Sequence, residues 1–397
     1  MKIPTETKNA TLNLLSELIS VHRESIISAN KRDLGSADNL DPTLIDRLKV
    51  DDNKIRGMIA AIEEVIRLDD PQGSVLSSYT HPNGMLVENK VVPFGKILII
   101  YESRPDVTIE AAISAFKAGN KILLKGGKEA RNTNLKLVEL WKKALSEHNL
   151  SEEMVTYLDI NREETQLLLK ENSHKVDLII PRGGDGLINY IKANTDIPLL
   201  VSGRGNNFIY IHKDADFEMA MELVLNGKSR LSVCNAIDKV LFHSSIPDLR
   251  AKIKALLTPL KIMKMEVFGV GEFFKPMTEI RFNNSEDRWY EEFLSAKLLF
   301  GVVDSLDEAI SKINKYSGGH SAVIVTENTL VAETFQEEVD CAAVYHNASS
   351  RFTDGGQFGF GAEIAISTQK LHFRGPLGLA QLVTNKWFIS GNGQVRE

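Results

Sequence analysis

The chain has 397 residues with 47 Lys or Arg against 53 Asp or Glu, which gives a formal net charge of −6, and it contains no basic block. These features argue against nucleic acid as the main partner. Two cysteines cannot build a disulfide framework, no leader peptide opens the chain, and no apolar run reaches the roughly 18 residues that span a bilayer. We therefore expect a soluble cytoplasmic protein of about two domains.

The first 90 residues predict helices followed by a hairpin. Apolar residues recur at helical spacing through about residue 70, for example at Leu12, Leu15 and Leu18, which indicates a helical lead-in. Residues 77–92 alternate loosely around the turn Pro82-Asn83-Gly84, a pattern that is typical of a two-stranded hairpin. Such hairpins often pair with another subunit.

From Gly95 onward, strands alternate with helices. We predict strands at 96–101, 121–124, 154–158, 176–180, 198–201 and 208–212, and helices at 107–118, 134–148, 163–171 and 186–193. This alternation predicts an α/β fold with a mostly parallel sheet, helices on both faces, and a ligand site at the carboxyl ends of the strands. The pattern is that of a cofactor domain.

A second alternating series follows, and it predicts a second α/β domain. Its predicted strands are 239–243, 298–303, 322–326 and 342–345, and its predicted helices are 247–260, 306–314 and 330–338. We place the cofactor domain at residues 1–226, the catalytic domain at 227–360, and a C-terminal segment at 361–397.

Cys234 lies in a short polar stretch between a predicted helix (217–228) and a predicted strand (239–243). Its neighbour Asn235 is polar, and the segment lies near the junction of the two domains, where catalytic clefts usually form. We interpret Cys234 as a candidate nucleophile, although free cysteines are commonly buried as core residues. Cys341, in an apolar run, is expected to be core.

Three segments at strand ends carry residues suited to anions. These segments are Glu102-Ser103-Arg104-Pro105, Lys125-Gly126-Gly127-Lys128 and Pro181-Arg182-Gly183-Gly184. Glycines let a ligand approach the backbone, helix N-termini favour anions, and ammonium groups neutralise phosphates. Each segment alone fits an ordinary turn, but three at adjoining strand ends favour a phosphate-bearing cofactor. The G-x-G-x-x-G fingerprint is absent.

Four segments resemble the signatures of the γ-glutamyl phosphate reductases, also called glutamate-5-semialdehyde dehydrogenases, a divergent family within the aldehyde dehydrogenase superfamily. The segments are residues 101–108, 181–184, 232–236 and 347–359. The resemblance implies an aldehyde dehydrogenase-like fold of two Rossmann-like α/β domains with a small oligomerisation hairpin at 75–93. It also implies that residues 361–397 return to the cofactor domain and the oligomer interface.

The resemblance implies the second step of proline biosynthesis, in which NADPH reduces L-glutamyl 5-phosphate to L-glutamate 5-semialdehyde and phosphate is released. Cys234 would form a thioester, with its thiolate favoured by backbone amides or by a cation such as Arg230. By the same alignment, Ser103 Oγ and the Cys234 N–H would bind the oxyanion, and Asn235 is grouped with the catalytic residues. The alternative for Ser103 is that it caps the following helix.

One departure from ordinary aldehyde dehydrogenases favours a reductase. Those enzymes carry a Glu before a Gly-Gly pair as the base that drives hydrolysis of the thioester, whereas residues 200–206 here read Leu-Val-Ser-Gly-Arg-Gly-Asn. A reductase gains nothing from activating water, since hydrolysis would discard the thioester.

The resemblance also assigns binding residues, and it implies no metal ligands. Lys125 would contact the adenosine ribose, Lys128 and Arg131 a 2′-phosphate, and Glu292 the nicotinamide ribose. The further cofactor residues are Gly126, Gly127, Arg182, Gly183, Gly184 and Phe358. For the charged residues, a solvated surface role is the alternative.

Substrate residues follow from the same block and from nearby cations. The amino-acid head would be held by Arg351, Thr353, Asp354 and Glu363, and the phosphate by Arg104 or Arg230. Alternatively, Arg351 and Asp354 pair with each other and fix the loop. His320 matches a family position and is as often structural as functional.

Two other functions remain open: an acylating reductase that uses coenzyme A, and a catalytically silent scaffold. We expect a homodimer or higher homo-oligomer, in which the hairpin and residues 382–390 pair across the interface. Glutamate 5-kinase is a possible partner, because it makes the labile substrate.

Overall fold

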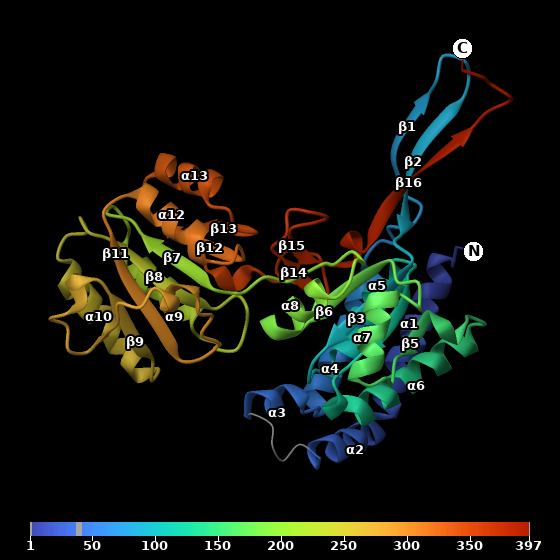
Figure 1. The fold of residues 1–397 in the computed structure, drawn as a ribbon, viewed down its shortest axis with the longest axis horizontal. Helices are drawn as coiled ribbons and strands as arrows, with labels where there is room; N and C mark the ends of the chain where they lie inside the picture. The colour runs from blue at the N-terminus through green and yellow to red at the C-terminus, as the bar shows by residue number, and fades with distance from the viewer. Residues whose placement is uncertain (1, 37–41, 397) are drawn as a thin grey trace. The chain divides into compact units, whose positions relative to one another are not determined.

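The computed structural model describes residues 2–36 and 42–396, and the chain divides into two compact units (Figure 1). The first unit extends to Val201 and also includes Gly359–Ala365 and the residues from Pro376 onward. The second unit consists of Ser202–Phe358 and Ile366–Gly375. Within the described ranges, no helix has the length and apolar character needed to cross a membrane.

The first unit is built on a four-stranded parallel sheet with the order β5-β4-β3-β6. Its strands are β3 (Lys96–Tyr101), β4 (Lys121–Lys125), β5 (Val155–Tyr157) and β6 (Leu178–Arg182). Residues 97–101 are buried, as expected for a strand that is covered on both faces. Ile97 and Ile99 point into one apolar cluster, and Leu98 and Ile100 point into another, because side chains alternate along a strand.

Helices cover both faces of this sheet. They are α1 (Thr5–Val21), α2 (Arg23–Leu34), α3 (Pro42–Leu48), α4 (Asp52–Arg67), α5 (Val107–Lys117), α6 (Arg131–Glu147), α7 (Arg162–Glu171) and α8 (Asp185–Ala193), with 3₁₀ turns η1 (Lys128–Ala130) and η2 (Glu152–Met154). Apolar residues of α1, α4, α5 and α6 form one core cluster, and those of α7 and α8 belong to the other. The predicted helical lead-in is therefore part of the core.

One predicted strand of this unit is wrong. Residues 198–201 form only an isolated bridge, between Leu199 and Ile179 of β6. The local sequence pattern gave no sign that this run would pair at a single residue.

The predicted hairpin forms and gains a third strand. β1 (Val75–Thr80) and β2 (Leu86–Pro93) are antiparallel, and β16 (Val383–Ser390) pairs with β2 along its whole length. Gly84 has a φ of +88° in the connecting turn, which glycine adopts without strain. The terminal run pairs with β2 of its own chain, and the resulting three-stranded sheet leaves β1 and β16 as its edges.

The second unit contains a seven-stranded parallel sheet with the order β10-β9-β11-β8-β7-β12-β13. Its strands are β7 (Asn207–Ile211), β8 (Ile237–His243), β9 (Glu266–Val270), β10 (Arg281–Phe282), β11 (Lys297–Val303), β12 (Ser321–Val325) and β13 (Ala343–His346). β9 and β10 were not predicted: β9 is a short strand that contains a glycine, Gly269, and β10 has two residues.

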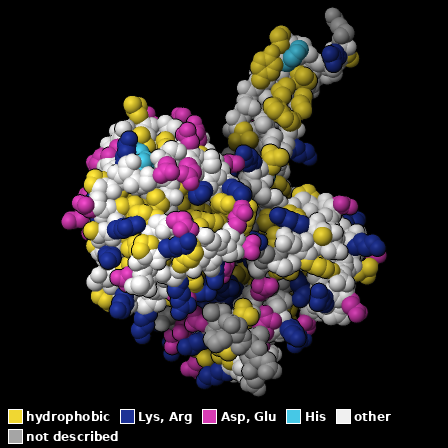
Figure 2. All heavy atoms as spheres, turned by 60° about the vertical axis from the view of Figure 1, so that its left-hand side comes forward, with side chains coloured by type: hydrophobic (Ala, Val, Ile, Leu, Met, Phe, Trp, Pro, Cys, Tyr) yellow, Lys and Arg dark blue, Asp and Glu magenta, His cyan; other side chains and the backbone are white. Residues whose placement is uncertain are grey.

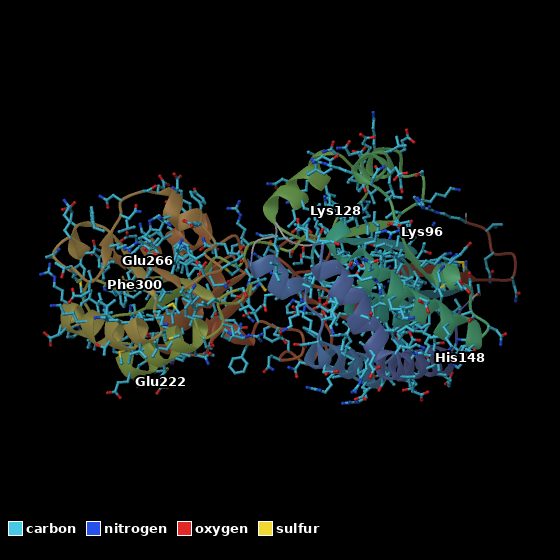
Figure 3. All side chains as sticks on the ribbon, turned by 90° about the horizontal axis from the view of Figure 1, so that it is seen from below. Lys96, Lys128, His148, Glu222, Glu266 and Phe300 are labelled. Carbon is cyan, nitrogen blue, oxygen red and sulfur yellow. The ribbon has the colours of Figure 1, made fainter. Side chains whose placement is uncertain are left out.

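Helices again cover both faces. They are α9 (Phe217–Gly227), α10 (Leu249–Ile262), α11 (Asp287–Tyr290), α12 (Leu306–Tyr316) and α13 (Thr329–Glu338), with η3 (Glu272–Phe274) and η4 (Ser350–Phe352). Apolar residues of α9 and α10 pack on one face, where Phe300 is buried, and those of α12 and α13 pack on the other (Figure 3). The remaining elements are β14 (Ala365–Ser367), β15 (Gly375–Leu377) and η5 (Leu379–Gln381).

The predicted domain boundaries require correction. β7 and α9 were placed in the cofactor domain, but β7 lies between β8 and β12 in the second sheet, so the division falls after Val201 and not after residue 226. The predicted C-terminal segment is also divided, because Ile366–Gly375 belongs to the second unit. Local periodicity identifies each strand but does not show which sheet it joins.

Candidate active site

Cys234 is exposed in the turn between α9 and β8. Cys341 is buried, and burial raises the pKa of its thiol to about 11, which suits the core position that the sequence indicated. Of the two thiols, only Cys234 is therefore presented at the surface of its unit.

The backbone of the Cys234 turn is held by Asn207, a buried residue at the start of β7. Its amide donates 2.7 Å hydrogen bonds to the carbonyls of both Cys234 and Ala236. Its Oδ1 accepts the Ser321 N–H at 3.0 Å. Asn207 therefore ties the turn to two neighbouring strands. This residue was not predicted, and its only signal in the sequence is a polar side chain at the start of an apolar strand.

Gly205 presses directly against this turn. A Cβ at position 205 would overlap the carbonyl group of Cys234, so only glycine fits. The Gly205 N–H donates to Glu292 Oε1 at 3.0 Å. The 200–206 segment thus shapes the backbone at Cys234, and Glu292 accepts a hydrogen bond from that segment.

Asn235 does not present its side chain to a substrate. Its amide donates to the carbonyls of Arg351 (3.1 Å) and Thr353 (3.0 Å), and its Oδ1 accepts from the Arg351 guanidinium. All three groups lie in the 350–353 segment. Asn235 therefore holds this loop, and its assignment as a catalytic residue stays a prediction.

Arg351 interacts electrostatically with the Cys234 thiol. Partial burial lowers the pKa of Arg351, the nearby Arg230 lowers it further, and the charges of Cys234 and Asp354 oppose this shift. Asp354 Oδ1 instead accepts the N–H of Gly356 at 3.0 Å. The Asp354 charge attracts the Arg351 guanidinium, but no ion pair joins them among those described, so the alternative of a pair that fixes this loop stays a prediction.

Thr353 and His320 belong to a buried polar network and not to a substrate pocket. Thr353 Oγ1 shares hydrogen bonds with Ser321 Oγ (2.8 Å) and Tyr345 OH (2.7 Å), and its side chain is inaccessible. His320 Nδ1 contacts Ser321 Oγ at 2.8 Å, and burial lowers the pKa of His320 to about 4. The histidine is neutral at pH 7, and both residues have structural roles.

In the first unit, the three predicted strand-end segments meet at one edge of the sheet, because β4, β3 and β6 are neighbours. The Glu102 N–H donates to the Arg182 carbonyl (3.1 Å), and the Gly184 N–H donates to Glu102 Oε2 (3.1 Å). A Cβ at Gly183 would lie 2.7 Å from Glu102 Cδ. The glycines thus permit the close approach of two adjoining turns.

The Ser103 side chain bonds to Glu129 in this arrangement. Its hydroxyl donates to Glu129 Oε1 at 2.7 Å, and its N–H donates to the same atom at 3.0 Å. Helix α5 begins without a side-chain cap, so the capping alternative is wrong. The Ser103 hydroxyl has a single proton, and that proton is used in the hydrogen bond to Glu129.

The cations at the end of β4 have different environments. Lys125 Nζ donates to the Gly126 carbonyl at 2.9 Å, and burial lowers the pKa of Lys125. Lys128, which is labelled in Figure 3, is exposed. Arg131 Nε donates to Asp159 Oδ1 at 2.8 Å, and this ion pair occupies its guanidinium.

The predicted substrate residues are divided between the two units. Glu363 belongs to the first unit, whereas Arg351, Thr353 and Asp354 belong to the second. Arg104, in the first unit, pairs with Asp106 at 3.1 Å. Phe358, the last residue of its segment in the second unit, is exposed. Within the described part of the chain, no group of three or more His, Cys, Asp or Glu side chains could hold a metal ion.

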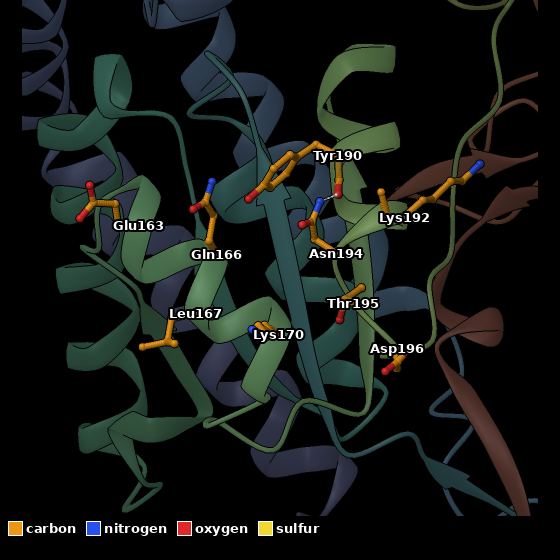
Figure 4. A pocket seen from close by; sticks show the side chains of 10 residues that line it. Glu163, Gln166, Leu167, Lys170, Tyr190, Lys192, Asn194, Thr195 and Asp196 are labelled. Atoms are coloured by element: carbon orange, nitrogen blue, oxygen red, sulfur yellow. Dashed lines mark hydrogen bonds between the residues drawn. The ribbon is translucent and has the colours of Figure 1, made fainter.

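A cavity of about 670 Å³ lies between α7 and α8 (Figure 4). Its lining is mostly polar and consists of Glu163, Gln166, Leu167, Lys170, Tyr190, Lys192, Ala193, Asn194, Thr195 and Asp196. The Asn194 amide donates to the Tyr190 carbonyl at 2.7 Å. None of the glycine-rich turns contributes to the lining, and no motif in the sequence predicted this cavity.

We predict that Gly205→Ala reduces turnover at least about a hundredfold, because the new methyl group must displace the Cys234 carbonyl, and misplacement of a reacting group by about 1 Å costs that much. Steady-state kinetics with saturating substrates would measure the loss. Gly57→Ala is the control, since Gly57 lies in α4 and a Cβ added there would have no atom within 4 Å. Wild-type turnover in Gly205→Ala would contradict the prediction.

Comparison with known proteins places this chain in a family. The aldehyde dehydrogenase family matches residues 1–270 and 264–362. A gamma-glutamyl phosphate reductase of Caldicellulosiruptor saccharolyticus is 43% identical over 409 residues, covering 100% of this chain and 96% of the relative. One from Clostridium perfringens is 44% identical, covering 99% and 94%. The crystal structure of the Thermotoga maritima gamma-glutamyl phosphate reductase has a TM-score of 0.94 at 40% identity, covering 100% and 96%. The chain therefore belongs to the aldehyde dehydrogenase family and, within it, to the γ-glutamyl phosphate reductases.

Proposed function

We propose that this chain reduces L-glutamyl 5-phosphate to L-glutamate 5-semialdehyde and releases phosphate, the second step of proline biosynthesis. The names of its full-length relatives support this reaction. The observation that carries the chemistry is an exposed Cys234 in a turn whose backbone is held by Asn207 and Gly205. An accessible thiol on a rigid backbone suits covalent catalysis.

The proposed reaction proceeds through a thioester. Cys234 Sγ attacks the acyl phosphate carbon, the carbon–oxygen bond to phosphate breaks, and phosphate leaves with that electron pair. The reduced nicotinamide, when bound, supplies a hydride to the thioester carbon. The resulting hemithioacetal then expels the Cys234 thiolate and leaves the aldehyde.

The cations near Cys234 support the first step. Arg351 interacts electrostatically with Cys234 and has Arg230 nearby, so this positive charge would favour the thiolate and attract an anionic phosphate. The Cys234 N–H is the oxyanion donor that we propose. Ser103 would first have to break its bond to Glu129, so we give it no part in this step. Residues 200–206 supply no carboxylate to activate water, which protects the thioester from hydrolysis.

Membership of the aldehyde dehydrogenase family implies a nicotinamide cofactor, and the strand-end turns of the first unit fit such a molecule. Gly184 precedes α8 without a side-chain cap, and no atom lies within 4 Å of the position of a Cβ there. Backbone N–H groups at a helix start suit a pyrophosphate. We propose that Gly126, Gly127, Gly183 and Gly184 allow the dinucleotide to approach, and that Lys125 contacts its ribose.

We further propose NADPH as the cofactor, because the exposed Lys128 follows this edge of the sheet. Arg131 is less suited to a 2′-phosphate, since Asp159 already pairs with it. Glu292 and Phe358 remain proposed contacts of the nicotinamide end. For the substrate we retain Arg104, Arg230, Arg351, Asp354 and Glu363 as candidates, and we exclude the buried Thr353.

The three-stranded sheet of β1, β2 and β16 supports a proposal of self-association. Exposed apolar side chains gather on this sheet (Figure 2), and they include Val75, Leu76, Tyr79, Trp387, Phe388 and Ile389. Large exposed apolar patches mark interaction sites. We propose a homodimer or higher oligomer that uses this sheet, in a reducing cytoplasm, with glutamate 5-kinase as a possible partner.

We predict that Cys234→Ser lowers turnover by several orders of magnitude in the reverse assay with semialdehyde, phosphate and NADP⁺, because a hydroxyl is a far weaker nucleophile than a thiolate. Initial rates of NADPH formation measure the loss. Cys341→Ser is the matched control and should remain active. Turnover with coenzyme A in place of phosphate would instead support the coenzyme A-dependent reaction, and unchanged turnover of Cys234→Ser would remove the covalent mechanism.

Lys128→Ala should raise KM for NADPH about tenfold, because the 2′-phosphate of NADPH would lose its charged partner. KM for NADH, which has no 2′-phosphate, should change less than about twofold. Steady-state kinetics with each cofactor measures the difference. Lys142→Ala, which removes an exposed lysine on α6, serves as the control. Equal effects on both cofactors would contradict the role of Lys128.

The double variant Tyr79→Glu/Trp387→Glu should be a monomer, because two buried charges would destabilise an apolar interface. Light scattering should report a mass near 44.2 kDa for the variant and a multiple of it for the wild type. Leu330→Glu replaces an even more exposed apolar residue, on α13, and should keep the wild-type mass. A monomeric wild type would contradict the proposal.

A further inference from the structure

Three charged residues are buried around the Cys234 turn, and the proposed reaction uses none of them. Lys228 directly follows α9 and precedes the turn. Asp238 and Lys239 lie in the first half of β8, after the turn. Their exposed fractions are 0%, 1% and 0%. Buried charges are costly to retain for stability alone, because apolar residues of similar volume often serve at least as well.

Asp238 bonds in two directions. One carboxylate oxygen, Oδ1, forms an ion pair with Lys228 Nζ. The other, Oδ2, accepts the backbone N–H of Phe293 at 2.6 Å. The ion pair therefore fixes the carboxylate that holds one end of the 291–293 segment.

Lys239 holds the other end of this segment. Its Nζ donates to the Glu291 carbonyl at 2.7 Å. The same ammonium lies 3.8 Å from the centroid of the Phe293 ring, which is a favourable cation–π distance. Asp238 and Lys239, which follow the Cys234 turn, thus bind both ends of the 291–293 segment.

Glu292, the middle residue of this segment, connects the cluster to the nucleophile. Its Oε1 accepts the Gly205 N–H, and Gly205 packs against the Cys234 backbone with no room for a side chain. A shift of the 291–293 segment would move this carboxylate, and Gly205 would lose the bond that holds it against the turn.

We propose that Asp238 and Lys239 are positioning residues for Cys234, and that they act by holding residues 291–293 so that Glu292 keeps Gly205 against the nucleophile's backbone. This inference rests on the proposed role of Cys234. It gives Glu292 a function in shaping the turn that is separate from any contact with the cofactor.

The test is a double-mutant cycle on kcat in the reverse assay. Lys239→Met removes the donor to Glu291 and keeps an unbranched side chain, and Glu292→Ala removes the acceptor for Gly205. We expect each single variant to lower kcat about tenfold or more, with little change in KM for the semialdehyde, because displacement of a nucleophile by even a fraction of an ångström slows the chemical step. The double variant should be no slower than the slower single variant, because both act through the same contact.

Two variants separate positioning from general destabilisation. Lys8→Met is the matched control, because Lys8 is equally buried and also donates to a backbone carbonyl, that of Lys117, in the first unit. It should lower the urea midpoint as Lys239→Met does, leave kcat unchanged, and combine additively with Glu292→Ala. Glu292→Gln retains an acceptor for Gly205 and should restore most of the kcat that Glu292→Ala loses.

If Lys239→Met does not fold, Asp238→Asn is tested in its place. The Asn amide oxygen can still accept from the Phe293 N–H, but the charge that pairs with Lys228 is removed. Loss of kcat in the double variant equal to the product of the two single losses would overturn the proposal. An effect of Lys239→Met on kcat no larger than that of Lys8→Met would also overturn it. Failure of the proposed function gives a different result, because the turnover of Cys234→Ser would then be unchanged from the wild type.

Discussion

The close contact between Gly205 and the Cys234 carbonyl is the constraint on which the proposed catalytic loop depends. Two segments 29 positions apart in the numbering meet with no space for a Cβ, so the backbone at 205 acts as a support for the turn that carries the thiol. Asn207 adds hydrogen bonds to the carbonyls on both sides of that turn. Cys234, the proposed nucleophile, is thereby exposed on a firmly held backbone, which would favour attack by reducing the reorganisation that the reaction requires.

Buried polar groups support this contact from several directions. Asn235 ties the turn to the 350–353 segment, and the cluster of Lys228, Asp238 and Lys239 holds the segment that contains Glu292. Each of these groups is hydrogen-bonded, as it must be, because a buried polar group without a partner costs free energy. The arrangement uses polar side chains to define one backbone geometry around an accessible sulfur.

The same principle applies to three of the predicted site residues. Asn235, Thr353 and Ser103 are polar residues beside recognised motifs, and their positions in the sequence predicted contacts with substrate or an oxyanion. Their donors and acceptors are instead satisfied within the protein, by Arg351, Ser321 and Glu129 respectively. A polar residue near a motif has the right chemistry for catalysis and for internal support alike, and only its partners distinguish the two.

The sequence by itself determined most helices and strands, the hairpin, the exposed turn with Cys234 and the family, because these depend on local periodicity, turn residues and contiguous motifs. Only the tertiary structure decided that β7 joins the second sheet, that β16 completes the hairpin sheet, and that Gly205, Asn207 and Glu292 surround the nucleophile. The physical reason is that strand pairing and buried hydrogen bonds join residues far apart in the chain. No periodicity within one segment records which distant backbone will accept its hydrogen bonds.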